Sequence, residues 1–294
     1  METTLGRPVT HHRTSNILKT TVLLAAMSAL TLGVGQVIGG PRGLLWAGVF
    51  VVVMNFASFW FSDRLALMMN RAQPLPPGEL PWLEAMTADL ARRAGLPMPR
   101  LYLVDSPTPN AFATGRSPAK AAVAVTTGLL NLLGKRELAG VIAHELSHVK
   151  NRDTLIMTVA ATLAGVITHV AQMIFFWGGA LFHRGDDEDE GGSLLSTLGV
   201  LIVAPIAATL LQLAISRARE FDADASAVGV TGDPEGLASA LSKLESGNRA
   251  LPLDHSPATA HLFIVNPLSG RGVMGLFATH PSIEDRIQRL LQMR

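Results

Sequence analysis

Residues 154–183, TLIMTVAATLAGVITHVAQMIFFWGGALFH, form a stretch of 30 residues without a single Asp, Glu, Lys or Arg. About 20 apolar residues in a helix are enough to cross the hydrocarbon core of a bilayer. Three further charge-free stretches, residues 20–41, 43–62 and 191–216, contain 22, 20 and 26 residues. The sequence therefore predicts a mainly α-helical integral membrane protein. Its four predicted transmembrane helices are residues 17–40, 43–62, 154–182 and 194–216.

Composition narrows the class of protein further. Of 294 residues, 48% are hydrophobic and only 16% are charged, whereas a soluble domain usually has about 25% charged residues. This excludes an ordinary soluble enzyme and a disordered or fibrous chain. A net charge of +1 gives no reason to expect a nucleic-acid partner. The absence of cysteine excludes disulfides, a thiolate zinc site and a cysteine nucleophile.

The basic residues predict the orientation of the spans. Four spans place both termini on one side, and 22 of the 24 Lys and Arg residues fall there, all except Arg42 and Arg184. An excess of Lys and Arg near span ends marks the cytoplasmic face. We therefore expect a cytoplasmic tail at residues 1–16, an acidic external loop at 183–193, and one cytoplasmic domain made from 63–153 and 217–294.

The cytoplasmic domain is expected to mix helices with a small β-sheet. Short apolar runs bounded by Gly and Pro at residues 101–104 and 121–127 are typical of strands. Helical periodicity predicts helices at residues 79–95, 134–152, 233–246 and 281–291, the last with Pro281 in its first turn.

A metal-binding pattern lies at residues 144–148. His144 and His148 are four residues apart in HELSH, so on a helix they share one face and can reach one ion. Glu145 would project beside that ion and accept a proton from water. This is the H-E-x-x-H pattern of zinc peptidases. The alternative is a solvated helix face, but the opposite face of this helix is apolar.

A third ligand is expected from the helix that leaves the fourth span. Catalytic zinc usually takes three protein ligands and leaves one position open. Neither a His at position 154 nor an acid about 20 residues downstream is present. Glu220 lies as close to the fourth span as His148 lies to the third, on the same predicted side, which favours Glu220 as ligand over an ion-pair partner for Arg217 or Arg219. Asp224 would then orient a ligand imidazole.

Four segments together resemble the HtpX family of membrane zinc metalloproteases and, more distantly, the CAAX prenyl endopeptidases. They are HELSH with the following NRD, SRAREFDAD at 216–224, PNAFATG at 109–115 and THP at 279–281. The resemblance implies four transmembrane helices with a cytoplasmic zincin-like (gluzincin) α+β domain in the bacterial inner membrane. It also implies quality control of damaged or misfolded membrane proteins as the role. Phe221 departs from the Tyr expected there, which removes a hydroxyl but no ligand.

The resemblance also implies roles for individual residues. One Zn²⁺ would be bound by His144, His148 and Glu220, with Glu145 as catalytic base. Asn110 and His280 would contact the substrate backbone or the developing oxyanion. Alternatively, Asn110 shapes a turn and His280 caps the helix that follows it.

Three features of the sequence have no single assigned role. Residues 121–127 form either an edge strand that pairs with substrate or plain core. His169, inside the third span, is either functional or a neutral histidine bonded to another helix, and we favour the second. The stretch 255–272 has no assignment, and the oligomeric state is open.

Three functional hypotheses follow. The first is a membrane zinc endopeptidase acting on proteins and peptides, especially membrane proteins. The second is a prenyl-protein endopeptidase, which a fold with only four spans disfavours. The third is a non-enzymatic membrane scaffold, which the complete set of ligands and base disfavours.

Overall fold

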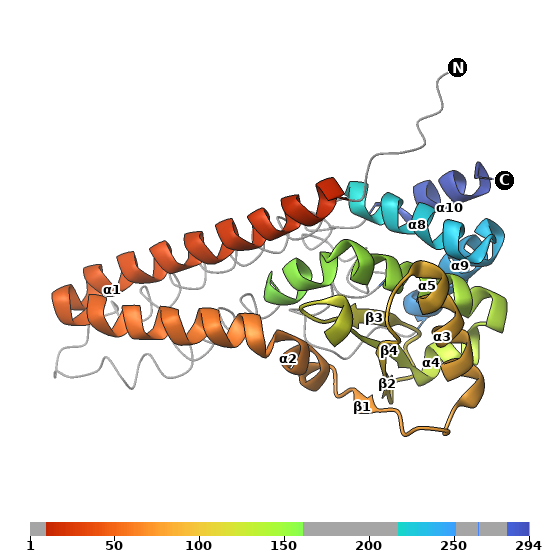
Figure 1. Ribbon diagram of the computed structural model, residues 1–294, viewed down its shortest axis with the longest axis horizontal. Helices are drawn as coiled ribbons and strands as arrows, with labels where there is room; N and C mark the ends of the chain where they lie inside the picture. The colour runs from red at the N-terminus through yellow and green to blue at the C-terminus, as the bar shows by residue number, and fades with distance from the viewer. Residues whose placement is uncertain (1–9, 161–216, 251–263, 265–280, 294) are drawn as a thin grey trace, which may run out of the picture.

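The computed structural model describes residues 10–160, 217–250, 264 and 281–293. It has two parts: a long helical hairpin, α1, and a compact α+β domain from which the hairpin projects (Figure 1). Residues 153–160 are also helical. In chain order the named elements are α1 (Thr10–Trp60), α2 (Ser62–Met69), β1 (Gln73–Pro74), α3 (Pro81–Ala94), β2 (Arg100–Val104), β3 (Ala111–Thr114), η1 (Pro118–Lys120), β4 (Ala122–Thr126), α4 (Thr127–Leu132), α5 (Lys135–Asn151), α8 (Arg217–Thr231), α9 (Pro234–Ala250) and α10 (Ile283–Leu291).

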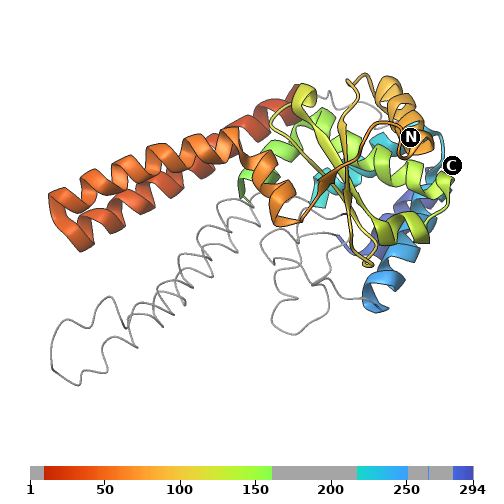
Figure 2. The same cartoon turned by 90° about the horizontal axis from the view of Figure 1, so that it is seen from below.

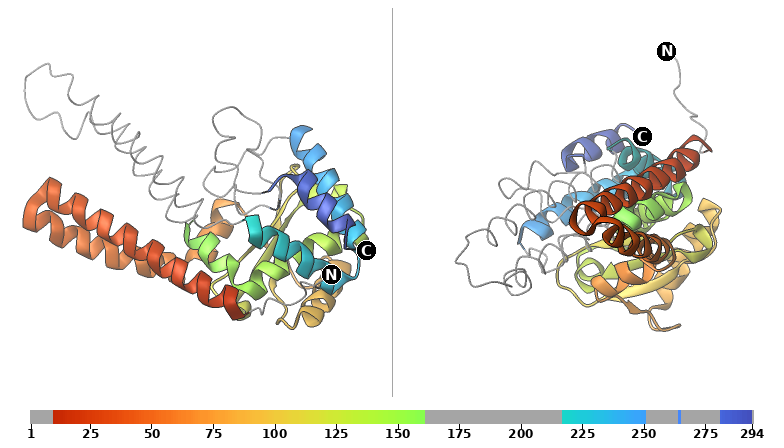
Figure 3. Two further views of the ribbon diagram at one scale, coloured as in Figure 1. Left: turned by 90° about the horizontal axis from the view of Figure 1, so that it is seen from above. Right: turned by 90° about the vertical axis from the view of Figure 1, so that its left-hand side faces the viewer.

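The hairpin reverses at Gly40, whose φ of 56° and ψ of −142° are non-helical. Glycine adopts this conformation without the steric penalty of a Cβ atom, and Pro41 then starts the second arm with a φ suited to a helix. The two arms lie side by side (Figures 2 and 3), and Asn55 Nδ2 donates a hydrogen bond to Ser28 Oγ across them at 2.9 Å. The reversal falls where the sequence predicts the turn between the first two spans.

The second arm has the properties of a membrane helix. Within the described residues, Gly40–Trp60 is the stretch long and apolar enough to cross a bilayer, and only 11% of its apolar window is buried. Leu45, Trp46 and Val52 are each more than 60% exposed, and a continuous apolar surface of this kind fits contact with lipid. The apolar part of the first arm, Thr20–Gly33, is shorter. The predicted helices at 154–182 and 194–216 lie outside the described residues, apart from 154–160.

The domain is built on a four-stranded sheet in the order β1-β2-β4-β3. β2 and β4 are parallel, and the other two pairs are antiparallel. Because side chains alternate along a strand, Val123 and Val125 of β4 enter a core with α3, α5 and α9, whereas Ala122 and Ala124 face the opposite side. That opposite side is covered by α2 and by residues 155–160.

The position of β4 decides between the two interpretations of residues 121–127. β4 lies between β2 and β3, so the edge-strand hypothesis is wrong and these residues are core. β4 pairs with β2 on one side and with β3 on the other, so neither side is left for a substrate strand. Among the residues that the structure describes, β3 is the edge strand beside β4.

The predicted helix at 134–152 is confirmed as α5, and one other helix boundary differs from expectation. The C-cap of α5 is Arg152, whose left-handed φ of 60° separates α5 from the helical residues 153–160. At the C-terminus, Pro281 precedes α10 and is not in its first turn. Ser282 is the N-cap, and its Oγ accepts a hydrogen bond from the Asp285 N–H at 3.1 Å.

Glycine contacts between the two arms give a prediction for the hairpin. A Cβ atom added to Gly43 would overlap with the carbonyl oxygen of Gly35, whereas one added to Gly33 would meet nothing within 4 Å. We expect Gly43→Ala to destabilise the protein by about 1–3 kcal/mol through overpacking and Gly33→Ala to leave its stability unchanged or higher. Thermal unfolding of both variants in the same detergent measures the difference, and equal midpoints would contradict the close packing of the arms.

Candidate metal centre

Helix α5 is the rigid element on which the centre is built. Its apolar face, with Leu138, Val141 and Ile142, is fully buried between the sheet and α8, α9 and α3. At its first turn, the Glu137 carboxylate accepts a hydrogen bond from the Gly134 N–H at 2.9 Å. Side chains that project from this helix are therefore held in fixed positions.

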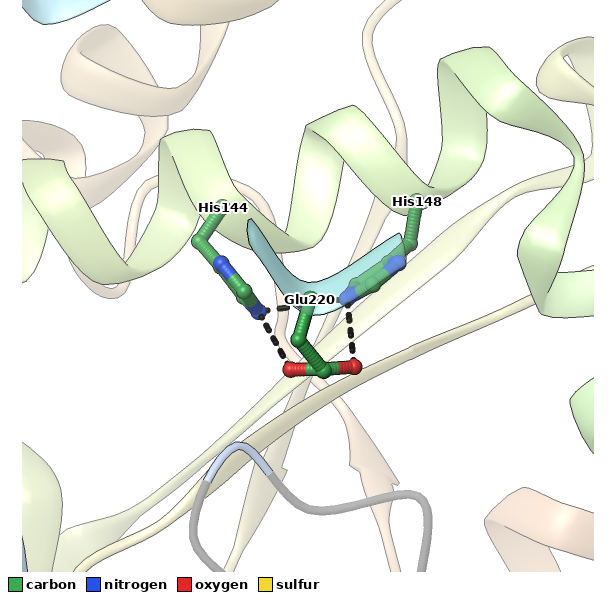
Figure 4. Close-up of side chains that lie close together, drawn as sticks. All are labelled: His144, His148 and Glu220. Atoms are coloured by element: carbon green, nitrogen blue, oxygen red, sulfur yellow. Dashed lines mark hydrogen bonds and ion pairs between the residues drawn. The ribbon is translucent and has the colours of Figure 1, made fainter. Parts of the chain in front are cut away.

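Three buried side chains from two helices converge on one point. His144 and His148 project from the same face of α5, and Glu220 reaches them from α8, which packs against it (Figure 4). The two Nε2 atoms are 3.1 Å apart. Glu220 Oε2 lies 3.6 Å from His144 Nε2, and its Oε1 lies 3.5 Å from His148 Nε2.

This geometry fits a tetrahedral metal ion. With zinc–nitrogen and zinc–oxygen bonds of about 2.0–2.2 Å, two ligand atoms of a tetrahedral site lie about 3.3–3.6 Å apart. The three observed separations span 3.1–3.6 Å. Imidazole nitrogen and carboxylate oxygen are also donors that zinc accepts, so both the residue types and their spacing suit such an ion.

Each histidine is oriented from behind by a second carboxylate. His144 Nδ1 lies 2.9 Å from Asp224 Oδ1, and His148 Nδ1 lies 3.1 Å from Asp153 Oδ2. An imidazole that donates its Nδ1–H to a carboxylate presents its Nε2 lone pair to the metal position. The pairing of Asp224 with an imidazole follows the sequence expectation, whereas Asp153 is missing from it. The sequence signal for Asp153 is the NRD segment that follows HELSH. In the structure, the left-handed backbone of Arg152 turns the chain so that Asp153 reaches His148.

A buried arginine that the sequence analysis missed stabilises one of these carboxylates. Arg286, from α10, is 1% exposed and donates from Nε and Nη2 to both oxygens of Asp224, at 2.8 and 2.7 Å. Its Nη1 donates to the carbonyl oxygen of Ile264 at 3.0 Å and lies 3.6 Å from Glu220 Oε2. The available signal was its position on the apolar face of α10, between Ile283 and Leu290.

The acids around His144 and Arg286 make the centre favour positive charge. Burial alone would lower the pKa of His144, but hydrogen bonds to Asp224 and Glu220 outweigh it and raise this pKa to about 9. Burial would raise the pKa of Asp224, but Arg286 and His144 hold it below its usual value. A point where these groups stabilise a cation electrostatically suits a metal ion.

Glu145 lies beside the histidines in a different electrostatic setting. Burial raises the pKa of Glu145, and neither His144 and His148 nor the hydrogen bond from the Ala113 backbone fully offsets that effect. A carboxyl group with a raised pKa takes up and returns a proton more readily near neutral pH. The Ala113 contact also ties Glu145 to the edge strand β3.

Of the two remaining predicted site residues, Asn110 lies in the described part of the chain and His280 does not. Asn110 is buried just before β3, where its N–H donates to Thr126 Oγ1 at 2.9 Å and its Oδ1 accepts from the Ala111 N–H at 3.0 Å. These contacts fit a residue that shapes the start of β3. His280, His169 and, apart from Ile264, the stretch 255–272 lie outside the described residues. The Ile264 N–H donates to the carbonyl oxygen of Ala111 at 3.4 Å.

Comparison with known proteins gives concordant results. Residues 77–294 match the model of peptidase family M48. A protease HtpX homolog from Desulforapulum autotrophicum is 51% identical over 277 residues, which cover 94% of this chain and 89% of that protein. Another, from Syntrophobacter fumaroxidans, is 52% identical over 279 residues, covering 94% and 98%. The crystal structure of S. mikatae Ste24p shares the fold, with a TM-score of 0.51, 20% identity, and coverage of 96% of this chain and 67% of that one.

The orienting carboxylate Asp224 gives a prediction about metal affinity. Asp224→Asn replaces a charged acceptor of the His144 N–H with a neutral amide, and loss of such a contact typically weakens metal binding by about 10–100-fold. Asp222→Asn is the matched control, because Asp222 is exposed on the same helix. Competition with a zinc chelator measures the affinity, and equal affinities of the two variants would contradict the role of Asp224.

Proposed function

The chain belongs to peptidase family M48 and is a metalloprotease, and we propose that it is a zinc-dependent endopeptidase of the bacterial inner membrane. Its substrates are membrane proteins, including misfolded and damaged ones, that it cleaves at the cytoplasmic face. The observation that carries the proposal is the buried convergence of His144, His148 and Glu220 beside Glu145.

The residues of the centre divide the chemistry between them. His144, His148 and Glu220 would hold the zinc ion, which supplies Lewis acidity to the scissile carbonyl group and to the attacking water. Glu145 takes the proton of that water and passes it to the leaving amine. Asp224 and Asp153 keep the two imidazoles oriented.

Substrate binding is proposed along β3. An edge strand can add an extended peptide through main-chain hydrogen bonds, and β3 is the edge strand tied to Glu145 through Ala113. Asn110 supports this role because it shapes the start of β3. His280 is proposed as a donor to the oxyanion on the basis of the family resemblance. In the sequence it shortly precedes α10, which carries Arg286 to within 3.4 Å of His144 Nδ1.

The membrane placement is supported by the hairpin and by the charge distribution. The second arm of α1 exposes apolar side chains along a length sufficient to cross a bilayer. Lys and Arg are concentrated on one predicted side of the four spans, which is the cytoplasmic side by the usual bias. Membership of a peptidase family, together with a complete ligand set, argues against the scaffold hypothesis.

Glu145→Gln tests the catalytic proposal. The amide cannot accept a proton, so we expect cleavage of an unstructured protein to fall by at least about 100-fold while bound zinc stays at the wild-type level. Glu284→Gln, at an exposed position on α10, is the control and should cleave normally. Unchanged cleavage by Glu145→Gln would contradict its role as base. Faster cleavage of a farnesylated peptide than of the unmodified protein by the wild type would favour the prenyl-protein alternative.

The natural lack of cysteine allows a clean test of orientation. Single cysteines are introduced at the exposed positions Lys135 on α5 and Asp222 on α8, and at Asp187 in the predicted external loop. A membrane-impermeant maleimide should label position 187 in intact spheroplasts, and positions 135 and 222 only after the membrane is opened. Labelling of 135 and 222 from opposite sides would contradict a centre shared by α5 and α8.

A further inference from the structure

A polar cavity lies where the hairpin joins the domain, lined by residues that are not part of the metal centre. It has a volume of about 220 Å³, several times the roughly 30 Å³ that one water molecule occupies in the liquid. Trp60 at the end of α1 forms one wall. The polar residues that line it are Asp63, Arg64, Arg100, Arg116 and Lys120.

The cavity is strongly basic. Four cationic side chains and one carboxylate line it, and Arg100 Nη2 pairs with Asp63 Oδ2 at 3.0 Å. Because Asp63 offsets the charge of Arg100, the other three cations, Arg64, Arg116 and Lys120, leave the cavity with a net charge of +3. Positive charge gathered in a concave site attracts an anion more strongly than the same charges spread over a surface.

The loop that carries Arg116 and Lys120 is held in place. Gly115 has a φ of +136°, and a Cβ atom there would come within 2.7 Å of the Lys120 carbonyl oxygen, so the loop closes tightly on itself. Thr154 Oγ1 donates to the Gly115 carbonyl oxygen at 2.9 Å. The Arg116 guanidinium lies 4.1 Å from the centre of the Trp60 ring, a cation–π contact. The Arg116 guanidinium and the backbone that carries Lys120 are therefore held in place.

With the membrane placement proposed above, the same contacts put the cavity at the level of the membrane surface. Trp60 ends the helical stretch that can cross a bilayer, and Thr154 begins the next charge-free stretch of the sequence. Tryptophan favours the boundary between headgroups and acyl chains, and basic pockets at this depth suit anionic lipid headgroups. The second arm of α1 is followed directly by α2 of the domain (Figure 1).

We propose that this cavity binds the phosphate of an anionic phospholipid from the leaflet that faces the domain. The three cations contact the phosphate diester, and the rest of the headgroup occupies the remaining volume. The inference rests on the proposed membrane placement. Inorganic phosphate offers similar chemistry, but the indole wall and the position beside two apolar segments favour a headgroup.

The experiment uses the full chain carrying Glu145→Gln, which prevents self-digestion, purified in detergent. Native mass spectrometry measures binding of phosphatidylglycerol and of phosphatidylcholine with identical acyl chains. We expect phosphatidylglycerol to bind about tenfold more tightly, and Arg116→Gln with Lys120→Gln to remove that preference. Arg92→Gln with Arg93→Gln changes the net charge equally on α3, at the end of the domain away from the hairpin (Figure 1), and should keep the preference.

Each other outcome overturns the proposal. If the double variant at 116 and 120 keeps the preference for phosphatidylglycerol, the cavity is not its binding site. If both double variants lose the preference equally, the preference depends on the net charge of the protein and not on the cavity. Thermal stabilisation by millimolar inorganic phosphate that depends on Arg116 and Lys120, without lipid selectivity, would assign the cavity to free phosphate. Carbonate extraction of wild-type membranes is measured separately, since release into the supernatant would contradict the membrane placement itself.

Discussion

The structure depends on one geometric requirement, that His144 and His148 on α5 meet Glu220 on α8 at a single point. These two helices are separated in sequence by the two longest apolar stretches of the chain. Only an even number of membrane crossings between them lets both helices lie in one domain on one side. The buried contact between α5 and α8 is therefore also a constraint on how the chain is threaded through a bilayer.

That point is surrounded by charges that satisfy one another. His144 is backed by Asp224 and then Arg286, and His148 is backed by Asp153, whose Oδ1 lies 3.8 Å from the Arg219 guanidinium. Burying any of these groups alone would be unfavourable, and removing one partner from a buried pair is far more destabilising than the pair is stabilising. These two chains of paired charges explain why so many ionisable side chains occur in the otherwise apolar interior of this domain.

The sequence predicts those parts of the centre that depend on local periodicity or on a known pattern. His144, His148 and Glu145 follow from spacing along one helix, and Glu220 from its distance to a span. Asp153 stands in the NRD segment and Arg286 on the apolar face of α10, but neither signal says what these side chains contact. Their positions depend on the left-handed Arg152 and on the packing of a distant C-terminal helix, which are tertiary facts. The same holds for β4, since strand order is set by non-local pairing.

The two-sided burial of the sheet has a practical consequence. One face of β4 packs under α5, but the other is covered by α2 and by residues 155–160, which lead directly into the long charge-free stretch. A fragment trimmed to the water-exposed half would uncover Phe112, Val104 and their neighbours and would aggregate. The domain shares this core with the segments that lead into the apolar stretches, so biochemical work has to keep them together.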